Sequence, residues 1–137
     1  MAAVSPVNES SGAVALGDHD PATLDQVLMG VRDGLGIIVA PVGVQDPGNL
    51  GAIIRTAAAA GAAGVAVAEH SADPFGWKAL RGAMGSTFRL PVAEAGNAAD
   101  AIRRAREAGF TILAAVPRAG RALYDADLRG RRFVLVG

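Results

Sequence analysis

The chain has 137 residues, enough for one hydrophobic core but not two, and 51% of them are hydrophobic while only 4% are aromatic. Thirteen basic residues balance 13 acidic ones, and the absence of cysteine excludes a disulfide framework, a thiolate zinc site and a cysteine nucleophile. The N-terminal residues lack the features of a signal peptide and the longest apolar run, residues 57–68, is too short to span a bilayer, so we expect a cytoplasmic protein with no membrane partner.

Arginine dominates the basic residues. Twelve of the 13 basic side chains are arginine, and all but one of the 13 follow residue 46. A guanidinium binds phosphate through two hydrogen bonds and stacks on bases, which favours an RNA-binding protein. GC-rich codon usage predicts the same bias equally well, so composition leaves both explanations open.

In the N-terminal part of the chain, the sequence pattern predicts a strand, a helix and a second strand. Residues 12–16 form a short apolar strand, and Thr23 can cap a helix with an apolar face made by Leu24, Val27, Leu28 and Val31. Residues 36–42, GIIVAPV, form an unbroken apolar run with β-branched side chains. Such a run is typical of a parallel strand that is covered on both faces.

A turn at residues 45–49 then introduces a helix over residues 50–60, for which Asn49 is the expected N-cap and Gly61 the left-handed end. The remaining elements alternate along the chain. They are a strand at 64–68, a short helix at 75–81, a strand at 87–92, a helix at 97–108 and strands at 111–116 and 133–136. This order predicts an α/β fold with a parallel sheet and helices on both faces.

The most specific stretch is DPGNLGAIIRTA, residues 46–57, in which a turn leads directly into a helix rich in small residues. At about 100° per residue, Leu50, Ile53, Ile54 and Ala57 share the core face, whereas Arg55 lies on another face beside glycine and alanine. A bulky anion such as an RNA phosphate can reach such a guanidinium. A solvated surface arginine explains the pattern equally well, so both interpretations stay open at this point.

The same stretch, extended through residue 65 as DPGNLGAIIRTAAAAGAAGV, closely resembles the first signature motif of the SpoU, or TrmH-like, RNA 2′-O-methyltransferases. Asn and Arg of that motif fall on Asn49 and Arg55. The resemblance continues in KALRGAMGSTFRLPV (78–92), where Ala83 replaces a serine found in many members, in ILAAVP (112–117) and in FVLVG (133–137), which is similar to the opening of the second motif.

This resemblance implies a Rossmann-like N-terminal part of a trefoil-knot (SPOUT) methyltransferase domain over residues 35–137, with residues 1–34 as a strand and helix that lead into it. It implies S-adenosyl-L-methionine as cofactor, bound near Ala115, Val116 and Gly137, with no metal. It also implies Arg55 and Asn49 as catalytic residues and a homodimer. The family's third motif would lie beyond Gly137, so we expect a truncated domain with an incomplete knot.

The predicted reaction is methyl transfer to a ribose 2′-hydroxyl of ribosomal or transfer RNA, with Arg55 and Arg81 contacting the RNA. Because a guanidinium stays protonated, positioning the ribose is a safer role for Arg55 than base catalysis. One alternative is a non-catalytic RNA-binding or dimerisation module. Another is an unrelated doubly wound protein that binds a metabolite at its strand ends.

Three further groups of residues have two interpretations each. The arginines in the second half of the chain could follow an RNA backbone or simply be solvated. Trp77 and Phe75 could stack on a base, although packing of a short helix on the sheet is the commoner role. His19 and His70 are too far apart in the sequence to suggest a metal pair, and we expect both in polar loops.

Overall fold

The computed structural model describes residues 15, 17–31, 34–118 and 120–137. It contains one sheet of five parallel strands, in the order β3-β2-β1-β5-β4. The strands are β1 (Gly36–Pro41), β2 (Gly64–Ala68), β3 (Val92–Gly96), β4 (Thr111–Ala114) and β5 (Arg131–Val136). The predicted α/β class is confirmed, whereas the strand expected at residues 12–16 falls almost entirely outside the described residues.

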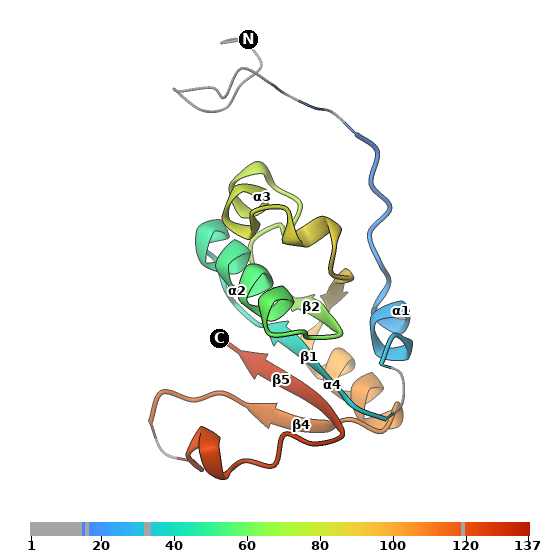
Figure 1. The fold of residues 1–137 in the computed structure, drawn as a ribbon, viewed down its shortest axis with the longest axis vertical. Helices are drawn as coiled ribbons and strands as arrows, with labels where there is room; N and C mark the ends of the chain where they lie inside the picture. The colour runs from blue at the N-terminus through green and yellow to red at the C-terminus, as the bar shows by residue number, and fades with distance from the viewer. Residues whose placement is uncertain (1–14, 16, 32–33, 119) are drawn as a thin grey trace.

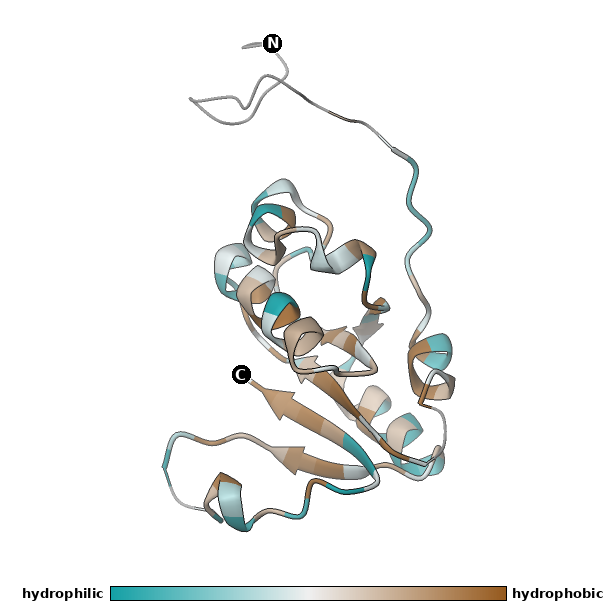
Figure 2. Cartoon of the chain, in the orientation of Figure 1, coloured by the Kyte–Doolittle hydropathy of each residue, from teal (hydrophilic) through white to brown (hydrophobic). Residues whose placement is uncertain are grey.

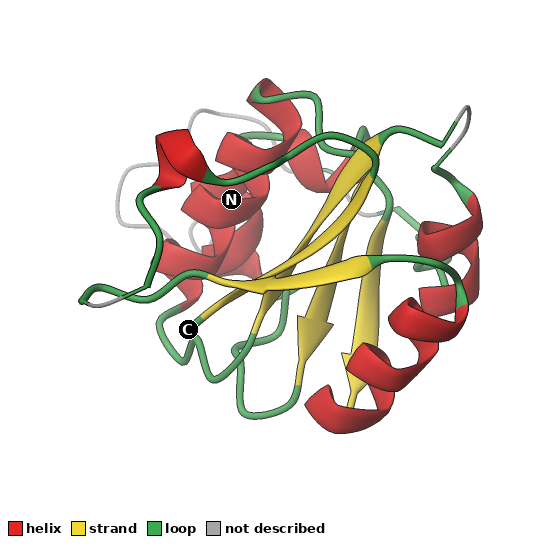
Figure 3. Cartoon of the chain, turned by 90° about the horizontal axis from the view of Figure 1, so that it is seen from below, coloured by secondary structure: helices red, strands yellow, loops and turns green. Residues whose placement is uncertain are grey.

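Helices cover both faces of the sheet (Figures 1 and 3). Helices α1 (Leu24–Met29) and α4 (Ala98–Glu107) lie on one face, and α2 (Pro47–Ala59) and α3 (Trp77–Ala83) on the other. Two short 3₁₀ helices, η1 (Ser86–Phe88) and η2 (Leu123–Asp125), complete the described elements. Within the described residues, no helix has the length and apolar character needed to cross a membrane.

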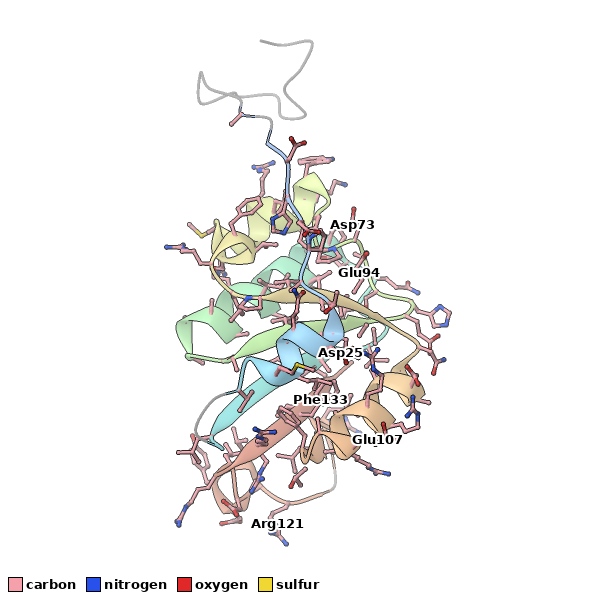
Figure 4. The ribbon with its side chains drawn as sticks, turned by 90° about the vertical axis from the view of Figure 1, so that its right-hand side faces the viewer. Asp25, Asp73, Glu94, Glu107, Arg121 and Phe133 are labelled. Atoms are coloured by element: carbon pink, nitrogen blue, oxygen red, sulfur yellow. The ribbon has the colours of Figure 1, made fainter. Side chains whose placement is uncertain are left out.

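The alternation of side chains along β1 divides the core into two clusters. Ile38 and Ala40 point into a cluster shared with α1, α4 and Phe133 of β5. Val39 packs against the opposite cluster, which is built by Leu50 and Ile54 of α2 on strands β2 and β3. Phe133 is fully buried and is labelled in Figure 4. The two buried faces explain why β1 is an unbroken apolar run rather than an alternating one.

Helix α1 begins where the sequence predicts. The Thr23 hydroxyl accepts a hydrogen bond from the amide of Gln26 (3.2 Å), and the Gln26 side chain accepts one from the Thr23 amide (2.7 Å). This reciprocal pair is a capping box, which satisfies two backbone donors at the helix start. Leu24, Val27 and Leu28 then join the core, so α1 packs on the sheet as an integral part of the fold.

The strand predicted at residues 87–92 is wrong. Residues 86–88 form η1 instead, and β3 begins only at Val92, after Pro91. Met84 (φ 50°) and Gly85 (φ 80°) both adopt left-handed backbone conformations, which turn the chain sharply after α3. Residues 86–90 therefore continue as η1 and a turn, and pairing with β2 begins at Pro91, whose carbonyl accepts a hydrogen bond from the Val65 amide (2.9 Å). The helix predicted at 75–81 exists but is shifted to Trp77–Ala83.

Candidate functional site

The segment after β1 places the start of α2 at the carboxyl edge of the sheet. Asp46 is the N-cap, and its carboxylate accepts a hydrogen bond from the amide of Asn49 (2.7 Å). Pro47 occupies the first helical position, where its missing N–H costs nothing. The prediction of Asn49 as N-cap is therefore wrong. Asn49 lies in the first helical turn with an exposed side chain.

Glycines bring α2 and α3 into backbone contact. A Cβ atom on Gly51 would lie 2.4 Å from the carbonyl oxygen of Ala79 and 2.8 Å from the amide nitrogen of Ala83. A Cβ on Gly82 would lie 3.0 Å from the carbonyl oxygen of Gly48. Gly51 therefore leaves no open space, because α3 packs directly on it, whereas the Arg55 side chain is exposed as the sequence predicts. The small residues serve to fix α3 against the motif helix.

Arg55 lies in the third turn of α2 with an exposed side chain on the side that faces α3. Its Nη1 donates a hydrogen bond to the sulfur of Met84 (3.2 Å). Among the described residues Arg55 forms no ion pair with a carboxylate. The guanidinium is held by a neutral, polarizable partner and keeps an uncompensated positive charge.

Met84 joins two arginines at the end of α3. Its left-handed backbone directs a side chain that is 67% exposed outward, toward Arg55. Its carbonyl oxygen accepts a hydrogen bond from Arg89 (3.4 Å). Sequence patterns did not identify Met84, since a non-glycine residue with positive φ carries no clear sequence signal. The result is two neighbouring cations on the surface beside the motif helix.

Arg81 lies on α3 beside a shallow groove at the start of α2. The groove has a volume of about 520 Å³ and is lined by Asp46, Pro47, Gly48, Trp77, Lys78, Arg81 and Gly82. The Arg81 guanidinium carbon lies 5.8 Å from the centre of the Trp77 ring, and Lys78 Nζ lies 5.6 Å from it. The side chain of Trp77 therefore forms part of this surface. It does not pack α3 on the sheet, which was the commoner of its two expected roles.

Ala115 and Val116 line a larger cavity of about 800 Å³ over β4 and β5. Its floor is apolar and includes Leu113, Val134 and Val136, in agreement with the hydrophobic colour of these strands in Figure 2. The loop that follows β4 and carries η2 forms its other wall. This size and lining are typical of small-ligand sites.

Asp127 and Arg132 supply charge at the polar end of this cavity. Asp127 accepts a hydrogen bond from the backbone amide of Arg129 (3.0 Å), and Arg132 lies 3.2 Å from its other carboxylate oxygen. These two contacts, the backbone hydrogen bond first, lower the pKa of Asp127 below its ordinary value. The carboxylate thus stays ionised under all ordinary conditions.

Gly137 follows β5 at the same carboxyl edge. A Cβ atom there would lie 2.7 Å from the carbonyl oxygen of Val42, so the close approach of the two strand ends favours glycine. Val42 in turn donates its amide to the carbonyl of Val136 (2.9 Å). Gly137 is exposed and is not among the residues that line the large cavity.

The structure brings some of the predicted site residues together and separates others. Asn49, Ala115 and Gly137 all follow strands at the carboxyl edge of the sheet. Arg55 and Arg81 lie on the α3 side of the motif helix instead. The opposite side of that helix, with Ile53 and Thr56, faces the exposed sheet surface that continues into the large cavity. Arg55 does not line that cavity within one chain.

Sequence patterns also did not predict a hydrogen-bonded pair of side chains at the carboxyl edge. The side-chain amide of Asn97 donates hydrogen bonds to both carboxylate oxygens of Glu69 (2.9 and 3.1 Å). Glu69 follows β2 and Asn97 caps α4, so the pair ties the end of one strand to the start of a helix. This contact stiffens the edge from which the candidate site is built.

Several arginines that could follow an RNA backbone have local partners. Arg103 pairs with Asp100 and Glu107 on α4, and Arg104 pairs with Asp25 on α1. Asp25 and Glu107 are labelled in Figure 4, on the face that α1 and α4 cover. Arg131 donates to backbone carbonyls, and Arg132 pairs with Asp127. In the part of the chain that the structure describes, no group of three or more histidine or acidic side chains could hold a metal ion.

Comparison with known proteins identifies a family of RNA-modifying enzymes. Residues 36–137 match the SpoU rRNA Methylase family. An uncharacterized tRNA/rRNA methyltransferase of Synechocystis is 34% identical over 103 residues, which cover 75% of this chain and 37% of that protein. The 23S rRNA (guanosine-2′-O-)-methyltransferase RlmB of Xanthomonas campestris is 31% identical over 110 residues, 80% of this chain and 44% of RlmB.

Solved structures agree with this match. The AdoMet-bound rRNA methyltransferase of Sinorhizobium meliloti is 34% identical and superimposes with a TM-score of 0.73, over 86% of this chain and 44% of that one. The chain thus spans less than half the length of these relatives. The fold and the sequence of the motif helix therefore lead to the same group of proteins.

Proposed function

Because this chain belongs to the SpoU rRNA methylase family of RNA 2′-O-methyltransferases, we propose that it takes part in S-adenosylmethionine-dependent methyl transfer to a ribose 2′-hydroxyl of ribosomal or transfer RNA in the cytoplasm. The observation that carries this proposal is the exposed guanidinium of Arg55, which rises from the family's motif helix without an acidic partner among the described residues.

The large cavity over β4 and β5 fits the cofactor. Its apolar floor suits a flat adenine ring. We assign the adenosine to the part of the cavity beside Ala115 and Val116, and Gly137, at the end of the neighbouring strand β5, to the same site. When bound, S-adenosylmethionine supplies a methyl group that the neighbouring sulfonium makes electrophilic.

Arg55 binds the phosphate next to the target ribose and orients the 2′-oxygen. A guanidinium offers two parallel N–H donors to a phosphate and cannot give up its own protons. In the transfer the methyl carbon would leave the sulfur of the cofactor as it bonds to the 2′-oxygen, and because Arg55 cannot accept a proton, the hydroxyl proton would pass to water or to another base. Most of the acceleration comes from holding the two reacting atoms close and in line. Asn49 arranges the motif loop beside this arginine.

The position of Arg55 on the α3 side of the helix supports a homodimer as the working unit. Within one chain the large cavity lies beyond the opposite side of α2. In a homodimer the guanidinium of one copy can face the cavity of the other. Mixing the Arg55→Ala variant with a variant blocked in the cavity, such as Ala115→Trp, tests this arrangement. Activity regained on mixing supports a shared site, and no recovery shows that each site lies in one copy.

Two measurements test the proposed function. Calorimetry with S-adenosylmethionine reports cofactor binding, and transfer of a labelled methyl group to ribosomal or transfer RNA reports the reaction. We expect the Arg55→Ala variant to bind the cofactor normally and to lose about 100-fold or more in methyl transfer, because a misplaced substrate costs about that factor. Arg103→Ala, which removes another exposed arginine but one with acidic neighbours, is the matched control and keeps full activity.

Two outcomes would overturn the proposal. If Arg55→Ala transfers methyl groups within a few-fold of the unaltered chain, the positioning role is wrong. If the chain binds RNA but releases no heat with the cofactor and transfers no methyl group, the non-catalytic RNA-binding module is the correct interpretation.

A further inference from the structure

The groove between α3 and the start of α2 is a second candidate RNA contact, separate from the cavity over β4 and β5. We infer that it binds one nucleotide of a single-stranded RNA segment next to the target, with the base on the Trp77 ring and its phosphate between Lys78 and Arg81. This inference rests on the proposed function only in taking RNA as the partner.

Trp77 is an exposed aromatic ring in a chain with few aromatic residues. It is the only tryptophan, aromatic residues make up 4% of the sequence, and the Trp77 side chain is 42% exposed. It begins α3 and lines the groove instead of entering either core cluster. Aromatic side chains at such positions stack on unpaired bases, and this stacking accepts every base because each has a π-face.

The two cations beside the ring have no acidic partners among the described residues. Lys78 Nζ and the Arg81 guanidinium carbon lie 5.6 Å and 5.8 Å from the ring centre. Neither forms an ion pair with a described carboxylate, in contrast to Arg103 and Arg104 on α4. Because both cations lie over the ring and lack described acidic partners, a base that stacks there displaces a cation–π contact and leaves that cation for the base's own phosphate.

One acidic residue, Asp46, also lines the groove. Its carboxylate accepts the hydrogen bond from the Asn49 amide that caps α2, so one oxygen is already engaged. Two cations against one engaged carboxylate leave the groove with a net positive charge. This balance favours a polyanion over a basic or neutral partner.

Arg55 contacts Met84, the residue that ends α3, close to the groove but outside its lining. The carbonyl of Arg81 accepts a hydrogen bond from the Met84 amide (3.2 Å), and the Met84 sulfur accepts one from Arg55 (3.2 Å). Arg89 also reaches Met84. An RNA strand that places a phosphate on Arg55 can therefore pass along the end of α3 and present a neighbouring nucleotide to Trp77. The groove thus contributes to holding the substrate strand rather than to the transfer step.

The fluorescence of the single tryptophan tests this inference directly. We expect a labelled ten-nucleotide oligouridylate to quench Trp77 fluorescence with the same saturation curve as its anisotropy. Heparin, a polyanion without bases, is expected to bind without that quenching. Polyglutamate controls for an acidic protein partner and is expected to bind at least tenfold more weakly than the RNA.

Two sets of variants separate stacking from charge. The double variant Lys78→Ala, Arg81→Ala should weaken oligouridylate binding about tenfold at low salt. The slope of log binding constant against log salt concentration should become shallower by about 0.7 for each lost phosphate contact. Arg103→Ala with Arg104→Ala removes the same charge from α4 and should change neither value. Trp77→Phe retains a ring and should keep binding within about threefold, whereas Trp77→Ala should lose about tenfold.

The inference is overturned if RNA binds, by anisotropy, without quenching Trp77, or if heparin quenches it equally. Equal binding of polyglutamate, or an equal effect of the α4 double variant, would also overturn it. Absence of any RNA binding has the same consequence, and the calorimetric cofactor titration then shows separately whether the proposed enzyme survives. Quenching by RNA in a chain that binds no cofactor supports the groove while refuting the enzyme.

Discussion

Replacing Gly51 by alanine tests the backbone contact that connects the motif helix to α3. The added Cβ would lie 2.4, 2.8 and 2.9 Å from three backbone atoms of Ala79, Ala83 and Gly82. Backbone atoms cannot rotate away as a flexible side chain would, so α3 as a whole has to move. We therefore expect Gly51→Ala to destabilise the protein, although alanine is the better helix former.

The magnitude follows from two opposing effects. Overpacking in a tight contact costs about 1–3 kcal/mol, and three backbone contacts below 3.0 Å place this site near the upper end. Exchange of glycine for alanine inside a helix returns about 1 kcal/mol. The net loss in the free energy of unfolding is therefore about 2 kcal/mol, which lowers Tm by roughly 6–10 °C for a domain of this size.

Urea unfolding followed by two probes measures this loss. Trp77 fluorescence reports on α3 itself, and far-ultraviolet circular dichroism reports on the whole fold. Gly17→Ala is the matched control, because no atom lies within 4 Å of its added Cβ, and we expect it to change stability by less than about 0.5 kcal/mol. A Gly51→Ala protein as stable as the unaltered chain, or more stable, would refute the close contact between α2 and α3.

Two further predictions concern a helix cap and a carboxylate. Asp46→Ala removes the capping hydrogen bond (2.7 Å) at the start of α2 and should cost about 1 kcal/mol in urea unfolding, whereas Asp46→Asn should retain most of that stability because asparagine also caps well. The pKa of Asp127 in the folded protein lies below the ordinary 3.8, first because the Arg129 amide donates a hydrogen bond to the carboxylate. The ionised carboxylate therefore stabilises the fold fully above pH 3.8. This stabilisation is lost as the pH falls through the lower pKa of the folded state. Carbon-detected NMR titration should find that pKa, and Asp127→Asn should flatten the acid side of the stability curve in this pH range.

Clear results would contradict each of these predictions. Equal stability of the alanine and asparagine variants at position 46 would show that another group caps α2. An Asp127 pKa at or above its ordinary value would show that the hydrogen bond from Arg129 does not persist in solution.

Hydrophobic patterning along the chain was enough to predict the order and type of most elements. Apolar runs such as residues 36–42 and 64–68 are long enough for buried strands, and their alternation with helical patterns requires parallel pairing. Local chemistry also set several helix ends, as at Thr23 and Asn97. The N-cap of α2 could also have been predicted from the sequence. Proline favours the first helical position, so Pro47 indicates that Asp46 is the cap.

The tertiary structure alone decided the geometry around Arg55. Helical periodicity correctly placed this arginine away from the core, but it could not show that Gly51 touches α3 or that Met84, 29 residues away, binds the guanidinium. The strand predicted at 87–92 failed for the same reason, because the left-handed turn at Met84 and Gly85 overrides the local strand propensity. Periodicity reports which face of an element is apolar, whereas the neighbour that covers each face depends on contacts between residues distant in the chain.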